Sequence, residues 1–123
     1  MARIAYVAQH RRGLPELLKQ LSETGYVVYR LDPNQMAYRA LRDEMPDLVL
    51  ADMTLRPTHV QEVLEALSKS TITRTIPLAV VGISPADLEG TRSKAPFARE
   101  HHIGSVTRKL LIDIVKKLLV EEN

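Results

Sequence analysis

An aspartate stands at the end of a buried-type apolar run, in the segment "PDLVLADMTLRP" of residues 46–57. The letters before Asp52 are rich in valine and leucine, which is typical of a strand buried on both faces of a parallel sheet. In open α/β folds, ligands bind outside the carboxyl ends of such strands. Asp52 is therefore a candidate site residue: a reacting group, the remnant of one, or an acid in a salt bridge at the rim.

Basic side chains follow three of the apolar runs and are expected at the same edge of the sheet. These are Arg11, Arg12, Arg56, Arg108 and Lys109. An arginine within reach of Asp52 would pair with it directly, often through two parallel hydrogen bonds. We therefore expect a site in which arginine, in place of a metal ion, neutralises the carboxylate. The alternative for these residues is a solvated basic edge without a ligand.

The composition excludes several kinds of function. The 123 residues include no cysteine, so there is no disulfide, no thiolate zinc site and no cysteine nucleophile. The net charge is only +2, and four tyrosines, one phenylalanine and no tryptophan provide no aromatic platform for nucleic acid. The apolar runs are short and broken by charges, so we expect no membrane span, and a cytoplasmic location. No Ser–His–Asp or paired-carboxylate arrangement suggests an independent enzyme, and we expect no metal centre and no resident cofactor.

Strand and helix patterns alternate along the chain. Short apolar runs predict strands at residues 4–8, 26–31, 48–52, 77–83 and 103–107. Apolar stripes with helical spacing lie between and after them, at residues 14–21, 37–41, 60–67 and 111–118. Residues 85–102 carry Gly90, Pro96 and a poor stripe, which predicts a broken or shifted fourth helix. His101 and His102 are expected at a helix end. Repeated strand–helix units indicate an α/β sandwich with right-handed crossovers.

The ordered set of segments resembles the receiver domain of bacterial response regulators over essentially the whole chain. "PDLVLADMTLRP" is similar to the third strand and phosphoacceptor segment of that family, "TIPLAVVGIS" to its fourth strand, and "IGSVTRKLLIDIVKKLL" to its fifth strand and last helix. The resemblance implies an α/β, flavodoxin-like (CheY-like) three-layer sandwich. Its five-stranded parallel sheet would have the order 2-1-3-4-5, within one domain of residues 1–123.

The same resemblance identifies Asp52 as the counterpart of the phosphoacceptor. Two acids that end the first strand of the family help to hold Mg²⁺, and Ala8 and Gln9 stand in their places. Mg²⁺ requires hard oxygen ligands in a tight octahedral arrangement. Phosphoryl transfer to a carboxylate depends on such charge neutralisation. We therefore expect weak Mg²⁺ binding.

Three further positions of the family pattern are altered. Gly82 stands for the Thr or Ser that ends the fourth strand, Ser105 for the aromatic switch residue of the fifth, and Arg108 for the lysine after it. Without the hydroxyl and the ring, the usual switch lacks its moving parts. The sequence therefore predicts a pseudo-receiver that stays in one state.

The expected role is that of a protein–protein interaction module in bacterial two-component signalling or a phosphorelay. A homodimer through Ser105–Leu119 is one form that such contact could take. The alternative is a conventional receiver phosphorylated on Asp52. A remote alternative is a cobalamin-binding domain, because "AQHRRG" has the His and Gly of the D-x-H-x-x-G turn, although Ala8 replaces its aspartate.

Overall fold

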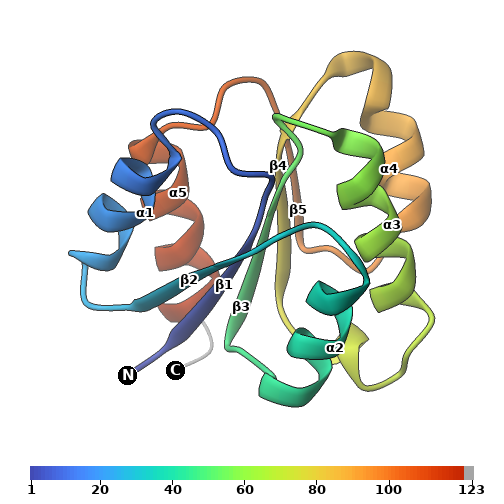
Figure 1. Ribbon diagram of the computed structural model, residues 1–123, viewed down its shortest axis with the longest axis horizontal. Coiled ribbons are helices and arrows are strands. Elements are labelled where there is room, and N and C mark those ends of the chain that lie inside the picture. Colours follow the sequence, from blue (N-terminus) through green and yellow to red (C-terminus); the bar gives the residue numbers. More distant parts are fainter. Residues whose placement is uncertain (121–123) are drawn as a thin grey trace.

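Five parallel strands form one sheet in the order β2-β1-β3-β4-β5 in the computed structural model, which describes residues 1–120 (Figure 1). The strands are β1 (Arg3–Val7), β2 (Val27–Leu31), β3 (Leu48–Asp52), β4 (Leu78–Ile83) and β5 (Glu100–Ile103). All four strand pairs are parallel. The predicted fold class and the strand order 2-1-3-4-5 are thus confirmed.

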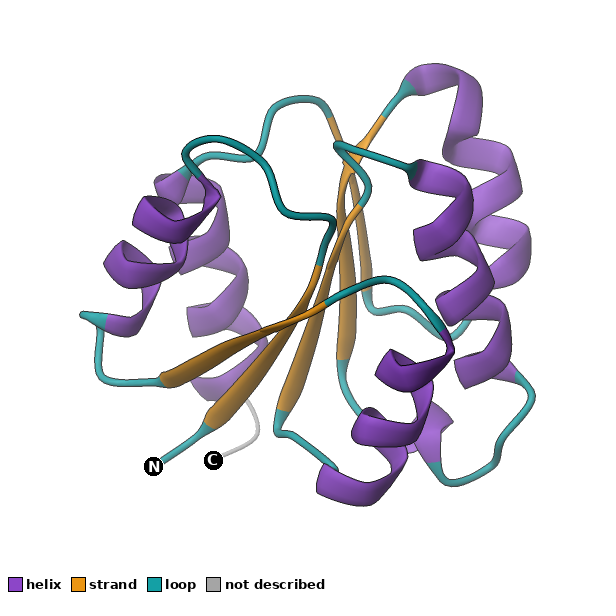
Figure 2. Cartoon of the chain, in the orientation of Figure 1, coloured by secondary structure: helices purple, strands orange, loops and turns teal. Residues whose placement is uncertain are grey.

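Helices cover both faces of this sheet and make the outer layers of the sandwich (Figures 1 and 2). They are α1 (Leu14–Ser22), α2 (Gln35–Glu44), α3 (Pro57–Ser68), α4 (Leu88–Lys94) and α5 (Arg108–Val115), with a π-helical turn over Lys116–Val120. α1 and α5 lie on one face, and α2, α3 and α4 lie on the other. Among residues 1–120, no helix is both long enough and apolar enough to cross a membrane.

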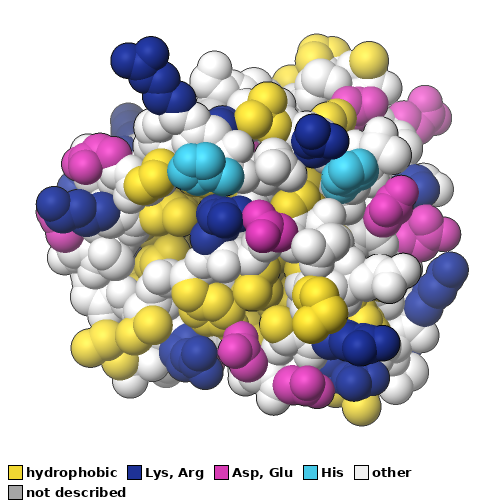
Figure 3. Space-filling model, viewed as in Figure 1, with side chains coloured by type: hydrophobic (Ala, Val, Ile, Leu, Met, Phe, Trp, Pro, Cys, Tyr) yellow, Lys and Arg dark blue, Asp and Glu magenta, His cyan; other side chains and the backbone are white. Residues whose placement is uncertain are grey.

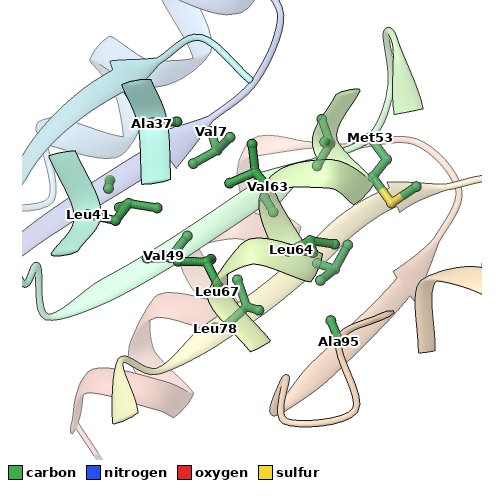
Figure 4. Packing of buried hydrophobic residues seen from close by; sticks show 14 of the residues in the cluster. Val7, Ala37, Leu41, Val49, Met53, Val63, Leu64, Leu67, Leu78 and Ala95 are labelled. Carbon is green, nitrogen blue, oxygen red and sulfur yellow. The ribbon is translucent and has the colours of Figure 1, made fainter. Parts of the chain in front are cut away.

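Alternate residues of each strand enter two separate hydrophobic clusters. In β3, Val49 and Ala51 belong to the cluster beneath α2 and α3, whereas Leu48 and Leu50 belong to the cluster beneath α1 and α5. Figure 4 shows the first cluster, in which Val63, Leu64 and Leu67 of α3 pack against the sheet. Because β3 is buried on both faces, a side chain at its end is positioned by packing from two sides.

The fifth strand lies earlier in the sequence than predicted. β5 spans Glu100–Ile103, and the predicted strand at residues 103–107 shares only Ile103 with it. The prediction missed this strand because its residues Glu100, His101 and His102 are polar. They can be polar because β5 is an edge strand whose side chains are only partly buried. Gly104 then takes a left-handed conformation with φ of 101°, and the Thr107 hydroxyl caps α5. His101 and His102 are therefore strand residues, and their expected place at a helix end is wrong.

The fourth helix is broken, as the sequence predicts. A short 3₁₀ turn over Pro85–Asp87 precedes α4, which has only seven residues. Before it, β4 contains an irregularity: its register with β5 shifts between Val80 and Ile83. Gly82 lies within this shift and has a φ of 67°, a conformation that glycine adopts readily. Gly82 follows Val81, the register partner of Asp52, and so lies beside the end of β3.

Candidate functional site

The carboxyl ends of β1, β3 and β4 converge around Asp52. Asp52 is the last residue of β3 and is 0% exposed. Its side chain lies on the α1–α5 face of the sheet, the face to which Leu50 and Tyr6 also contribute. Tyr6 of β1 is the register partner of Leu50. Two residues along β3 from Leu50, Asp52 comes within reach of the Tyr6 hydroxyl.

Four hydrogen bonds engage both carboxylate oxygens of Asp52. The Tyr6 hydroxyl and the Arg11 Nη2 donate to Oδ2, at 2.5 Å and 2.8 Å. The backbone N–H and the hydroxyl of Thr54 donate to Oδ1, at 2.9 Å and 2.6 Å. A buried carboxylate needs such partners, because its transfer from water is otherwise very costly. Asp52 is therefore a closed, fully partnered acid.

Tyr6 is the polar member of the otherwise apolar end of β1. Its ring is buried, and burial raises the pKa of Tyr6 well above its ordinary range. The adjacent Asp52 carboxylate raises this pKa further, and Arg11 offsets part of the effect. The hydroxyl thus keeps its proton and acts as a donor to Asp52 at neutral pH. Sequence reasoning missed Tyr6, although a tyrosine in a buried strand signals a hydroxyl that needs a partner.

Arg11 reaches Asp52 from the loop between β1 and α1. Its side chain is 17% exposed and forms an ion pair with Asp52 at 2.8 Å. The prediction of an arginine-paired Asp52 is confirmed. The contact uses Nη2 alone and is not a two-point fork, because Nη1 is buried and has no hydrogen-bond partner within residues 1–120.

Thr54 occupies the space that a side chain at position 82 would need. A Cβ added to Gly82 would lie 2.7 Å from the Thr54 Oγ1 and 2.8 Å from the Asp52 Oδ1. The hydroxyl beside the Asp52 Oδ1 thus belongs to the β3–α3 loop, and the absence of a side chain at Gly82 leaves room for it. Sequence reasoning noted Gly82 but missed Thr54, because no pattern in the sequence shows that the β4 irregularity makes room for it.

The residues at the end of β1 do not fit a magnesium ion. Ala8 is buried and has no ligand atom in its side chain, and Gln9 is partly buried and uncharged. Across residues 1–120, no three His, Cys, Asp or Glu side chains gather where they could hold a metal ion. The one carboxylate present, Asp52, is already bound to the cation of Arg11. Mg²⁺ would have to displace that guanidinium with almost no oxygen ligands of its own.

The other predicted site residues are spread around this edge of the sheet. Arg12 and Arg108 are exposed and line a hollow next to Arg11. Arg56 is exposed and precedes α3 in a left-handed conformation, with φ of 48°. Lys109 is exposed in the first turn of α5. Of these basic residues, only Arg11 pairs with Asp52.

Two positions named from the resemblance, Ser105 and Arg108, lie farther from the fifth strand than expected, because β5 ends at Ile103. Ser105 lies beyond the end of β5, so it is not a residue of the fifth strand. Arg108 is the first residue of α5, and the residue that directly follows β5 is Gly104. No side chain therefore extends from that position toward Asp52.

A hollow of about 600 Å³ opens above the site, and we call it the strand-end hollow. Its lining includes Arg11, Thr54, Gly82, Ser84, Asp87 and Ser105. Asp52 does not line the strand-end hollow, because its partners separate it from solvent. A ligand in the hollow would meet Thr54 and Arg11 before it met the carboxylate.

The structure is similar to solved receiver domains. The receiver domain of a signal transduction histidine kinase from Syntrophus aciditrophicus aligns with a TM-score of 0.82 and 24% identity, over 98% of this chain and 92% of that one. A putative response regulator from Chloroflexus aurantiacus aligns with a TM-score of 0.79 and 16% identity, over 97% and 98%. The receiver domain of a Pseudomonas aeruginosa sensor histidine kinase aligns with a TM-score of 0.74 and 16% identity, over 96% of this chain and 97% of that one.

The Pseudomonas domain has a magnesium ion coordinated in its active-site cleft. No family model matches the sequence, and no curated protein shows significant similarity to it. At these identities the likeness establishes the CheY-like fold and does not extend to the chemistry of the site.

Proposed function

We propose that the chain is a pseudo-receiver: a receiver-like domain that is not switched by Mg²⁺-dependent phosphorylation and acts as a protein-binding module in a signalling pathway. The observation that carries the proposal is the closure of Asp52. Both of its oxygens accept hydrogen bonds from Tyr6, Arg11 and Thr54, and its side chain is 0% exposed.

Phosphorylation would require this arrangement to open. The attacking oxygen must present a lone pair to the phosphorus, with cations placed to neutralise the moving group. In the structure Oδ2 already accepts from Tyr6 and Arg11, and Oδ1 accepts twice from Thr54. Removing Arg11 from the buried carboxylate would cost roughly 3–5 kcal/mol, the usual penalty for breaking a buried ion pair. We infer that the domain has no enzymatic activity of its own.

A docking role for the surface is part of the same proposal. On the face that presents the β2 edge, Figure 3 shows basic and acidic side chains interspersed, unlike the continuous basic surface that binds nucleic acid. We propose a protein as the partner. A second copy of the chain, bound through Ser105–Leu119, is one candidate, and the exposed cations Lys109, Lys116 and Lys117 lie in that region.

Phosphoryl donors test the proposal directly. The protein is mixed with Mg²⁺ and acetyl phosphate, or with Mg²⁺ and beryllofluoride, and followed by intact mass and backbone amide NMR. We expect no mass gain and no shifts at Asp52, Thr54 or Gly82 at millimolar concentrations. A phosphoryl mass gain that is lost in Asp52→Ala but kept in Asp87→Ala, a rim control in the strand-end hollow, would make the chain a conventional receiver.

A further inference from the structure

A second hollow lies beside the site, between the β1–α1 loop and the start of α5. Its volume is about 320 Å³, and we call it the arginine hollow. Its lining includes Arg11, Arg12, Glu16, Gln20, Thr107 and Arg108. In Figure 1 the blue loop after β1 and the orange-red segment before α5 both lie above the α1–α5 face. Segments almost a hundred residues apart thus bring three arginines to one small concavity.

Two of these arginines have no partner of opposite charge among the residues that the structure describes. Arg12 and Arg108 are exposed, and within residues 1–120 neither forms an ion pair or a side-chain hydrogen bond. Glu16 is the one carboxylate in the lining, and its Oε1 accepts a long hydrogen bond of 3.5 Å from Gln20. With Arg11 balanced by Asp52, the hollow keeps a surplus of positive charge.

Arg11 connects the arginine hollow with the buried acid. It lines both hollows, and its Nη2 holds Asp52. Its Nη1 is buried without a partner, and a buried donor left in this way is uncommon in folded proteins. The guanidinium therefore lies between the buried acid and a hollow that already carries Arg12 and Arg108, and its positive charge is close to both.

We propose that the arginine hollow binds the phosphate group of a small phosphorylated ligand. Arg12 and Arg108 are its main contacts, and Arg11 contributes charge from the side of the buried site. Guanidinium groups match the oxygens of a phosphate in geometry and charge, and they cannot lose their proton. The volume accommodates a small ligand and is at the lower end of the range for such sites.

This binding site is independent of phosphorylation. Its main residues belong to the first loop and to α5, and neither Arg12 nor Arg108 contacts Asp52. A phosphate held there makes no covalent bond and needs no Mg²⁺. The inference would therefore stand whether or not Asp52 can accept a phosphoryl group.

Titration with pyrophosphate in the presence of a chelator tests the inference. Backbone amide NMR on the whole chain should show saturable shifts at Arg12, Gly13, Thr107 and Arg108. The double variant Arg12→Gln/Arg108→Gln should weaken binding at least about tenfold, because each lost contact is a charge-assisted hydrogen bond. Both residues are exposed, so the variant should fold normally. Inorganic phosphate and a nucleoside diphosphate, titrated in parallel, distinguish the free anion from a phosphorylated metabolite.

A matched variant separates a site from a general charge effect. Arg39→Gln/Arg42→Gln removes the same charge from α2, on the other face of the sheet, and should leave binding unchanged. Equal weakening in the two double variants would overturn the inference, as would the absence of saturable shifts. Shifts centred on Thr54 and Gly82 would overturn it as well, because they would place the anion in the strand-end hollow. Acetate that binds as tightly as pyrophosphate would exclude selectivity for phosphate.

Discussion

At the scale of single residues, the hydrogen bonds around Asp52 decide what the site can do. A buried carboxylate with too few hydrogen bonds would destabilise the fold, whereas one that accepts four of them, as Asp52 does, is a stable part of the core. The same bonds that stabilise Asp52 occupy the lone pairs that a nucleophile needs. Asp52 can therefore act as a phosphoryl acceptor only if it gives up hydrogen bonds that stabilise the fold.

Tyr6→Phe should destabilise the protein while leaving its packing almost unchanged. The substitution removes the hydroxyl that donates to Asp52 Oδ2, and a hydrogen bond to a charged group contributes about 1.5–3 kcal/mol. Urea unfolding followed by circular dichroism measures the change. Tyr38→Phe on α2 is the control, and it should shift the free energy of unfolding by less than about 0.5 kcal/mol. If both variants lowered the free energy of unfolding equally, the hydrogen bond from Tyr6 to Asp52 would not be the stabilising contact proposed here.

Part of the site follows from the sequence. Arginines placed after parallel strands predict a cation near Asp52, and Arg11 fulfils that prediction. Tyr6 and Thr54 do not follow as readily, because their contacts depend on the register of β1 with β3 and on the shape of the β3–α3 loop. Local patterns predict which residues share an edge of the sheet. They do not predict which donor reaches which oxygen.

At the scale of elements, the irregular end of β4 matters most for the site. Gly82→Ala should destabilise the protein more than Gly13→Ala does. Both glycines have positive φ, and a left-handed conformation costs other residues about 1–2 kcal/mol. Only the Cβ at position 82 also collides with Thr54 and Asp52, whereas the one at position 13 meets nothing within 4 Å.

The comparison of these two glycine variants isolates the collision. Overpacking of this kind typically costs a further 1–3 kcal/mol, roughly. Thermal unfolding of the two variants side by side measures the difference. If Gly82→Ala and Gly13→Ala were equally stable, Thr54 would not be confined as the structure indicates.

β5 should make the stability of the fold sensitive to acid. Burial lowers the pKa of His101, and the nearby Arg92 and His102 lower it further, against the opposing hydrogen bond to the Ala95 carbonyl. The unfolded chain then binds a proton more readily than the native state just below pH 6.5, so the free energy of unfolding falls as the pH is lowered from about 7 to 5. His101→Gln should lose less stability over that range.

Melting temperatures at several pH values check this dependence on His101. His59→Gln, at an exposed position of α3, is the matched control and should keep the acid sensitivity of the unsubstituted chain. A pH profile that His101→Gln leaves unchanged would show that other groups carry the effect.

β5 is also the element that the sequence predicts least well. Its letters are polar because an edge strand in this fold is only half covered, so the apolar pattern that marks the inner strands is absent. Val106, the one apolar residue between Gly104 and α5, belongs to the loop that leads into α5. By contrast, β1, β3 and β4 are buried on both faces, and their continuous apolar runs locate them within one or two residues.

At the scale of the whole molecule, two hydrophobic layers share one sheet. Leu64→Ala in the α3 layer should lower the free energy of unfolding by about 2–5 kcal/mol, because Leu64 is fully buried. Since the strands belong to both layers, hydrogen exchange should become faster on the α5 side as well as on the α3 side. Leu55→Ala, at a position 40% exposed, should change stability by less than about 0.5 kcal/mol. Faster exchange confined to α3 would contradict a single cooperative core.

The architecture follows from the sequence because the local strand and helix patterns are consistent with a single overall fold. Apolar runs of strand length alternate with helical stripes, and right-handed crossovers leave few ways to assemble them. The resemblance to receiver domains then predicts the strand order that the structure has. The resemblance does not predict the boundary of β5 or the hydrogen bonds of Tyr6 and Thr54 to Asp52, since both depend on neighbours in three dimensions.

The close approach of Thr54 to Gly82 has a consequence for how this sequence can vary. Thr54 and a side chain at position 82 compete for one volume, so substitutions at the two positions are epistatic. A threonine or serine introduced at 82 alone meets an occupied space, and the loss of Thr54 alone leaves the Oδ1 of Asp52 without both its loop hydroxyl and a replacement. Mutational paths between this arrangement and one with a hydroxyl on β4 therefore pass through less stable intermediates, unless both codons change together.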